Sequence, residues 1–129
     1  MSTTTVLTEA DADRFVAEWM EAWNSHDLEA ILAHYADDVE YYSPFIAQLA
    51  DPSGRLTGRA ALRSYVAAAL ERFPDLHFDP PIHVAAGAGS VSFVYRSVNG
   101  LLAVETLVFG PGTPGRLSVA RAHCHYRPS

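Results

Sequence analysis

Two side chains of opposite charge, Arg96 and Glu105, stand on either side of a turn signal and suggest acid–base chemistry. The Asn99-Gly100 dipeptide between them is typical of a two-residue β-hairpin turn. Counting outward from that turn sets Val94 opposite Glu105 and puts Arg96 on the same face of the hairpin. A carboxyl group among apolar neighbours has a raised pKa, and a nearby guanidinium stabilises negative charge. We therefore predict Glu105 as a catalytic acid or base and Arg96 as its electrostatic stabiliser.

Small side chains continue this face if the loop from Gly110 to Gly115 has an even length. Glu105 then lies opposite Ala120, and Ala122 and Cys124 follow on the same side of the sheet. Because alanine fills little space, a pocket for a small molecule fits there. An odd loop would turn these residues to the other face.

The opposite face mixes bulky apolar and polar groups, as partner-binding surfaces do, so we expect a homodimer through this outer face. Its predicted members are Phe93, Tyr95, Leu102, Val104, Thr106, Val108, Arg121, His123 and His125. The alternative, which the pattern leaves open, turns Phe93 and Tyr95 toward the core. Arg96 and Glu105 would then form an exposed ion pair worth about 0–1 kcal/mol.

Neither a metal nor a cofactor is expected. His123 and His125 have a spacing that a metal site can use, but no cysteine or carboxylate recurs at a supporting interval. Cys124 is the only cysteine, so an intramolecular disulfide is excluded and an inert buried thiol is expected. His34, beside Tyr35, stays a candidate proton carrier.

Composition and charge narrow the class of protein. With 129 residues, 49% of them hydrophobic and 19% charged, the chain fits one globular domain over residues 1–129, with residues 1–8 as a flexible N-terminus. The net charge of -6 and the scattered basic residues argue against nucleic acid as a partner. The longest apolar run, Tyr65 to Leu70, is too short to cross a membrane, and we expect a cytoplasmic protein.

The elements that must position these residues follow from the hydrophobic period. Apolar residues at spacings of three and four predict helices over about 9–23, over a short stretch after Asp27 that reaches Tyr35, and over 57–73. Alternation predicts a strand over 39–43 and extended runs over 76–84, 91–98, 101–109 and 116–127. The segment 45–56 is predicted to be a loop. Helices followed by an antiparallel meander indicate an α+β fold, with the helices on one face of a curved sheet and a pocket at one end.

Several motifs resemble those of the SnoaL-like, nuclear transport factor 2-like superfamily, which also includes the ketosteroid isomerases. They are a long first helix with Trp19, Trp23-Asn24-Ser25-His26-Asp27-Leu28, Tyr35-Ala36-Asp37-Asp38-Val39, Ser43-Pro44, Leu56-Thr57-Gly58-Arg59-Ala60-Ala61-Leu62 and the closing hairpin, together spanning about residues 9–127. The resemblance implies a cone-shaped α+β fold. It implies a pocket that receives Trp19, Tyr35, Tyr41, Ser43 and Glu105 and is lined by Ala120, Ala122 and Cys124.

The chain departs from the ketosteroid isomerase pattern at two of three positions. The resemblance places Ser43 where such an enzyme has a proton-shuttling Asp, Trp19 where it has a donor Tyr, and Glu105 where it has a protonated Asp. Serine is no general base at neutral pH without a partner, so steroid isomerisation in that form is not expected.

The first expectation for function is a pocket for a small hydrophobic organic molecule, with cofactor-free isomerase or cyclase chemistry on a cyclic or polyketide-like substrate. A non-catalytic ligand-binding or dimerisation module is the second. An epoxide hydrolase of the limonene type is the third, but that chemistry needs an Arg flanked by two carboxylates, and the sequence offers one.

Overall fold

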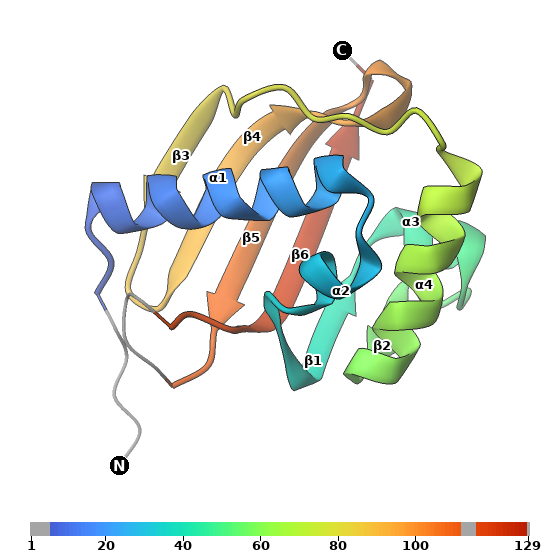
Figure 1. Cartoon of the computed structure of the whole chain (residues 1–129), viewed down its shortest axis with the longest axis horizontal. Helices are drawn as coiled ribbons and strands as arrows, with labels where there is room; N and C mark the ends of the chain where they lie inside the picture. The colour runs from blue at the N-terminus through green and yellow to red at the C-terminus, as the bar shows by residue number, and fades with distance from the viewer. Residues whose placement is uncertain (1–5, 112–115, 129) are drawn as a thin grey trace.

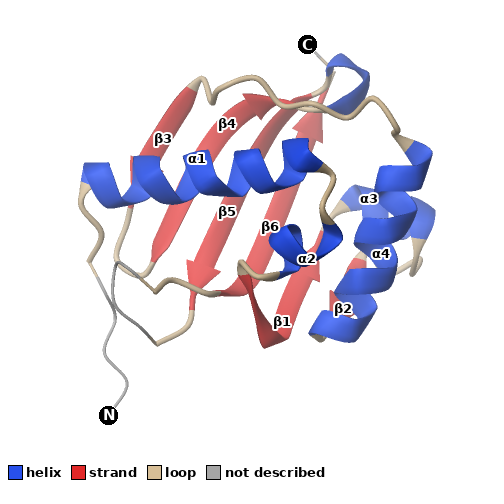
Figure 2. Cartoon of the chain, in the orientation of Figure 1, coloured by secondary structure: helices blue, strands red, loops and turns tan. Residues whose placement is uncertain are grey.

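A six-stranded sheet with helices packed on one face makes up the structure (Figures 1 and 2). The computed structural model describes residues 6–111 and 116–128. The strands are β1 Tyr35–Tyr42, β2 Arg55–Thr57, β3 His83–Ala86, β4 Ser90–Arg96, β5 Leu102–Phe109 and β6 Val119–Arg127. The helices are α1 Glu9–Ser25, α2 Leu28–Leu32, α3 Pro44–Leu49 and α4 Arg59–Arg72, with a 3-10 turn over Val98–Gly100. The predicted α+β class is confirmed.

The sheet is mixed rather than purely antiparallel. Its strand order is β2-β1-β6-β5-β4-β3, and β1 runs parallel to β6 while every other neighbouring pair is antiparallel. A parallel pair needs a long connection, and here residues 43–118, more than half of the chain, separate the two strands. In Figure 1, α1 crosses in front of β3 to β6, and α3 and α4 lie at the β1–β2 end.

Local capping signals explain where the predicted helices begin. Thr8 and Asp11 form a reciprocal capping box at the start of α1, with both hydrogen bonds at 3.1 Å. Asp27 caps α2 through the amides of Glu29 and Ala30. Gly58, with a positive φ of 91°, precedes α4. The three helices expected from the sequence are therefore present, although Tyr35 begins β1 instead of extending α2.

The segment predicted as a loop contains two further elements. Ser43 is the N-cap of α3 and Pro44 is its first residue, and β2 then pairs with β1. The extended run predicted for 76–84 shortens to β3, because Pro80-Pro81 supplies no amide donors for a sheet. Phe78 bonds the side-chain amide of Asn24 instead, at 2.7 and 2.9 Å.

The β4–β5 hairpin turns over three residues, not two. Ser97 N donates to Leu101 O at 2.8 Å, and both Asn99 and Gly100 have a positive φ. The pairing therefore moves by one residue, so that Phe93 and not Val94 lies opposite Glu105. The predicted common face of Arg96 and Glu105 is wrong.

The shift exchanges the two faces of β4. Phe93 and Tyr95 lie on the helix-covered face together with Glu105, and all three are buried. Arg96 lies on the outer face and is exposed. The alternative prediction is thus correct in placing Phe93 and Tyr95 in the core. It is wrong in placing Glu105 at the surface, because Glu105 is buried beside them.

For β6, the neighbour of β5, the sequence predicted the correct face of the sheet. Glu105 pairs with Cys124 instead of Ala120, and Ala122 pairs with Leu107, so Ala122 and Cys124 share the face of Glu105. Ala120 lies where the β5–β6 register shifts, between the pairs Val108–Arg121 and Phe109–Val119. It is only half-buried. Much of the predicted even loop from Gly110 to Gly115 lies outside the described residues.

The N-terminal segment and the outer sheet face complete the fold. Leu7 is buried at 6% exposure and its amide donates to Gly87 O at 3.2 Å, while residues 1–5 of the predicted flexible segment lie outside the described residues. The outer face carries Val104, 38% exposed. In the described part of the chain, no helix is both long and apolar enough to cross a membrane.

Candidate functional site

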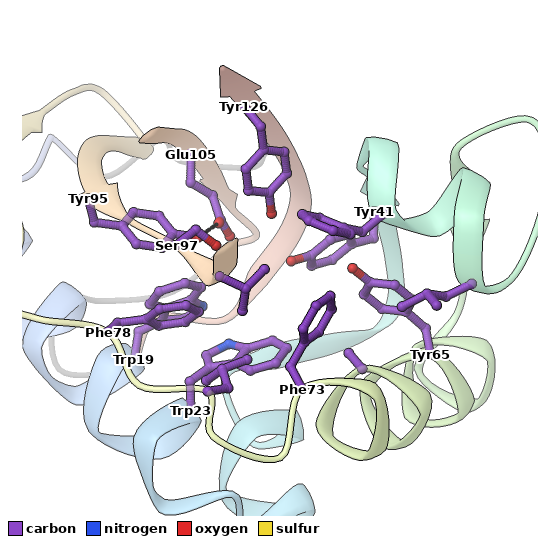
Figure 3. A pocket seen from close by; sticks show the side chains of 15 residues that line it. Trp19, Trp23, Tyr41, Tyr65, Phe73, Phe78, Tyr95, Ser97, Glu105 and Tyr126 are labelled. Carbon is purple, nitrogen blue, oxygen red and sulfur yellow. Dashed lines mark hydrogen bonds between the residues drawn. The ribbon is translucent and has the colours of Figure 1, made fainter. Parts of the chain in front are cut away.

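A narrow cavity lies between the helices and the inner face of the sheet. Its volume is about 40 Å³, room for about one to three water molecules. Nine aromatic side chains line it, together with Leu49, Ala69, Leu76, Ser97, Val98 and Glu105 (Figure 3). The aromatic residues are Trp19, Trp23, Tyr41, Phe45, Tyr65, Phe73, Phe78, Tyr95 and Tyr126. Among the described lining residues none is a Lys, Arg or His, so Glu105 is the sole lining residue that can carry a charge at neutral pH.

Glu105 projects from the middle of β5 into this aromatic environment. Its side chain is 1% exposed, and Tyr95 Oη donates to Glu105 Oε1 at 2.7 Å. The second oxygen, Oε2, is buried and has no hydrogen-bond partner in the described structure. Burial raises the pKa of Glu105 to about 7, against the opposing effects of the hydrogen bond from Tyr95 and of the nearby Cys124 thiol. The carboxyl group is therefore poised to take or give a proton near neutral pH.

The other titratable groups around Glu105 stay neutral at that pH. Burial raises the pKa of Cys124 and of all five neighbouring tyrosines above their ordinary values, and the charge of Glu105 adds to the effect. These tyrosines are Tyr35, Tyr41, Tyr65, Tyr95 and Tyr126. They offer hydroxyl groups as hydrogen-bond donors, but none supplies a charge.

Two tryptophans of α1 face the cavity with different hydrogen bonding. Trp19 Nε1 donates to Tyr35 Oη at 3.0 Å, and Tyr35 is fully buried behind the cavity wall. Trp23 Nε1 lies near enough to Tyr35 to favour its anion, but it does not reach hydrogen-bonding geometry and is buried without a partner. Trp19 was a predicted site residue and Trp23 was not, although the spacing of four residues puts both on one helix face.

Ser43 has a structural role at the position where the resemblance places a catalytic Asp. Its hydroxyl accepts a hydrogen bond from Phe45 N at 3.2 Å and so caps α3. The side chain is 4% exposed, and hydrogen bonding to it lowers the pKa of Tyr65 and Tyr126 slightly against the larger effect of burial. Ser43 is not among the residues that line the cavity.

The remaining predicted site residues divide between the wall and the exterior. Cys124 lies behind the lining and its thiol donates to Tyr41 Oη at 3.5 Å, while Ala122 is fully buried. Ala120 and Arg96 do not line the cavity. The small-residue pocket expected from the sequence is instead filled on the β4 side by Phe93 and Tyr95.

The histidines singled out in the sequence lie away from the cavity. The ring of His34 contacts Ala30 O at 3.0 Å and packs edge-on against Phe15. His123 stacks on Tyr42 with ring centroids 4.5 Å apart. Within residues 6–111 and 116–128 no group of His, Cys, Asp and Glu is arranged to hold a metal ion.

Comparison with known proteins gives a family. The SnoaL-like domain model matches residues 16–127, and no match is found among curated proteins. A SnoaL-like protein of unknown function from Burkholderia thailandensis is 47% identical, with a TM-score of 0.84 over 95% of this chain and 98% of its own.

Two more distant structures share the fold. A candidate polyketide cyclase from Sinorhizobium meliloti is 13% identical, with a TM-score of 0.71 over 92% of this chain and 100% of its own. A candidate ketosteroid isomerase from Kribbella flavida is 17% identical, with a TM-score of 0.63 over 93% of this chain and 80% of its own. The resemblance seen in the sequence is confirmed, and the chain belongs to the SnoaL-like family.

Proposed function

We propose that the cavity binds a small, largely apolar carbonyl compound and that Glu105 moves a proton on it without a cofactor. The observation that carries this proposal is the unpartnered Oε2 of Glu105, buried in an aromatic cavity. A buried polar atom without a partner costs about 1–3 kcal/mol, so its presence calls for an explanation beyond stability. A ligand that bonds this oxygen provides one.

The carboxyl group fits proton transfer in both directions. As a carboxylate, Glu105 takes a proton from the carbon beside a carbonyl or from the oxygen of the corresponding enol. It returns that proton to another atom of the same molecule, which completes an isomerisation. In a cyclisation, the enolate carbon instead attacks a second carbonyl carbon of the same molecule, whose C=O π bond opens, and the resulting alkoxide takes the proton back from Glu105. A pKa of about 7 suits this exchange. Neutral phenols of Tyr41, Tyr65 and Tyr126 line the same cavity and supply donors for a developing enolate oxygen.

Other chemistry has less support. Hydrolysis of an epoxide needs an Arg between two carboxylates, whereas Arg96 lies on the outer face and Glu105 is the single carboxylate among the described lining residues. Ser43 caps a helix and does not line the cavity, so it is no substitute for a second carboxylate. Among structures of the same fold, a candidate isomerase and a candidate cyclase agree with proton-transfer chemistry.

The ligand must open the cavity to enter. A space of about 40 Å³ is well below the roughly 150 Å³ of an apolar cavity that accepts benzene. A surface groove next to Asn99 shares Phe73, Leu76, Ser97 and Val98 with the cavity, so we propose this side as the entrance. Movement of the Phe73 and Val98 side chains would widen this entrance and enlarge the cavity.

Deuterium exchange tests the proposal without knowledge of the natural substrate. Cyclic ketones and enones are incubated with the protein in D₂O, and loss of the signals of hydrogens next to the carbonyl is followed by ¹H NMR. We expect exchange that Glu105→Gln abolishes and that the exposed control Glu18→Gln retains. Equal exchange in wild type and Glu105→Gln would contradict the proposal. Glu105-dependent binding without exchange would instead indicate a non-catalytic ligand-binding protein.

A further inference from the structure

Two buried atoms without partners belong to residues that line the same cavity, and they have complementary hydrogen-bonding character. Glu105 Oε2 is an acceptor when the carboxyl group is ionised, and Trp23 Nε1 is a donor only. Both side chains are more than nine-tenths buried, and both are labelled in Figure 3, on the β5 side and the α1 side of the cavity. The nearby Trp19 Nε1 already bonds Tyr35, which leaves Trp23 as the indole donor without a hydrogen-bond acceptor.

We propose that the cavity recognises a neutral hydroxyl group, an alcohol or enol, which donates to Glu105 Oε2 and accepts from Trp23 Nε1. This inference rests on the proposed function, since the enol of the proposed carbonyl substrate carries this hydroxyl group and occupies the same site. A hydroxyl group donates through its O–H and accepts through its oxygen, so one group can bond both side chains. Cyclic and polyketide-like molecules present this group on an apolar framework.

Charged head groups do not satisfy both side chains. A carboxylate or phosphate would place negative charge beside Glu105, with no cation among the described lining residues to offset it. An ammonium group would pair with Glu105 but has no lone pair for the Trp23 N–H. A ketone accepts from Trp23 but leaves the ionised Glu105 without a donor.

The rest of the ligand then points toward the entrance. Glu105 and Trp23 are buried, whereas Phe73 and Val98 are shared with the surface groove. The hydroxyl group therefore enters first, and an apolar body follows between Phe73, Val98 and Leu49. The expected ligand has a polar inner end and an apolar outer end.

Four compounds that share a cyclohexane ring and differ in their polar group test whether the cavity prefers a hydroxyl group. Cyclohexanol, cyclohexanone, cyclohexylammonium and cyclohexanecarboxylate are titrated into ¹⁵N-labelled protein near pH 8, where Glu105 is mostly ionised. We expect cyclohexanol to bind at least about tenfold more tightly than the other three. It should move the indole N–H resonance of Trp23 downfield and leave that of Trp19 nearly unchanged; Trp23→Phe assigns the signal.

A second variant makes the test independent of overall affinity. In Glu105→Gln the amide oxygen can keep the bond from Tyr95, which places the amide NH₂ where Oε2 was. A donor at that position favours a carbonyl, so we expect the preference for cyclohexanol over cyclohexanone to reverse. Far-ultraviolet circular dichroism checks that the variant is folded.

The outcomes separate this inference from the proposed function. Binding of cyclohexanone as tight as that of cyclohexanol in the wild type, or a Trp23 resonance that cyclohexanol does not move, overturns the hydroxyl assignment. If cyclohexanone binding still depends on Glu105, the proposed function survives that result. Absence of binding by all four compounds overturns both.

Discussion

Replacement of Glu105 by glutamine should change how stability depends on pH. The pKa of Glu105 is raised from 4.5 to about 7 in the folded protein, because burial disfavours the carboxylate. The folded state therefore binds the proton more tightly than the unfolded state. The associated stability is complete below about pH 4.5, declines as the pH rises toward 7 and is absent above it. A shift of this size corresponds to about 3 kcal/mol.

Glutamine keeps the size of the side chain and an acceptor for Tyr95 Oη, but it does not ionise. Urea unfolding of both proteins between pH 4.5 and 8.5 gives the difference in free energy of unfolding at each pH. We expect this difference to move by about 3 kcal/mol in favour of Glu105→Gln across that range.

The comparison removes other titrations that both proteins share, among them those of His123, Asp11 and Glu29. Glu18→Gln, on the exposed side of α1, serves as the matched control and should run parallel to the wild type. A difference between wild type and Glu105→Gln that stays constant over the whole range would refute the buried, proton-binding carboxyl group.

Three further predictions concern the cap, the cavity wall and the outer face. Ser43→Ala removes the cap of α3 and should lower the free energy of unfolding by about 1 kcal/mol in urea; an unchanged midpoint would be inconsistent with that role. Trp19→Phe leaves the Tyr35 hydroxyl without its donor and should lower the free energy of unfolding by about 1–3 kcal/mol, an expectation that wild-type stability would contradict. We propose that a second copy covers the outer sheet face around Val104, so sedimentation should give a dimer for the wild type and for the exposed α4 control Ala67→Arg, but a monomer for Val104→Arg. A monomeric wild type would rule this out.

Signals confined to one element predicted their structures well. The apolar periods of residues 9–23 and 57–73 located α1 and α4, because helical stripes depend on residues a few positions apart. The side of β6 was also predicted correctly, since strand alternation fixes Ala122 and Cys124 on one face.

The hairpin and the α3 cap show where such signals are insufficient. Asn99-Gly100 suits a two-residue turn, but both residues also tolerate the positive φ of the observed three-residue turn. That single residue moved Arg96 out of the site and brought Tyr95 in. Ser43-Pro44 carried an N-cap and first-turn signal, yet it was assigned to the end of a strand.

Long-range contacts account for the rest of the cavity wall. Phe78 reaches the site through bonds to Asn24, 54 positions earlier in the chain, and Tyr126 comes from the last strand. No local pattern relates such residues to Glu105. The resemblance to the SnoaL-like family supplied the inward position of Glu105, which the miscounted hairpin could not establish.

The most direct test of the central claim is the ionisation of Glu105 itself. The ¹³C resonance of its side-chain carboxyl group, assigned by comparison with Glu105→Gln, is followed from pH 4 to 9 in the free protein. A buried carboxyl group held in the aromatic cavity predicts a midpoint near 7. A midpoint near 4.5, the ordinary value for glutamate, would contradict the site proposed here.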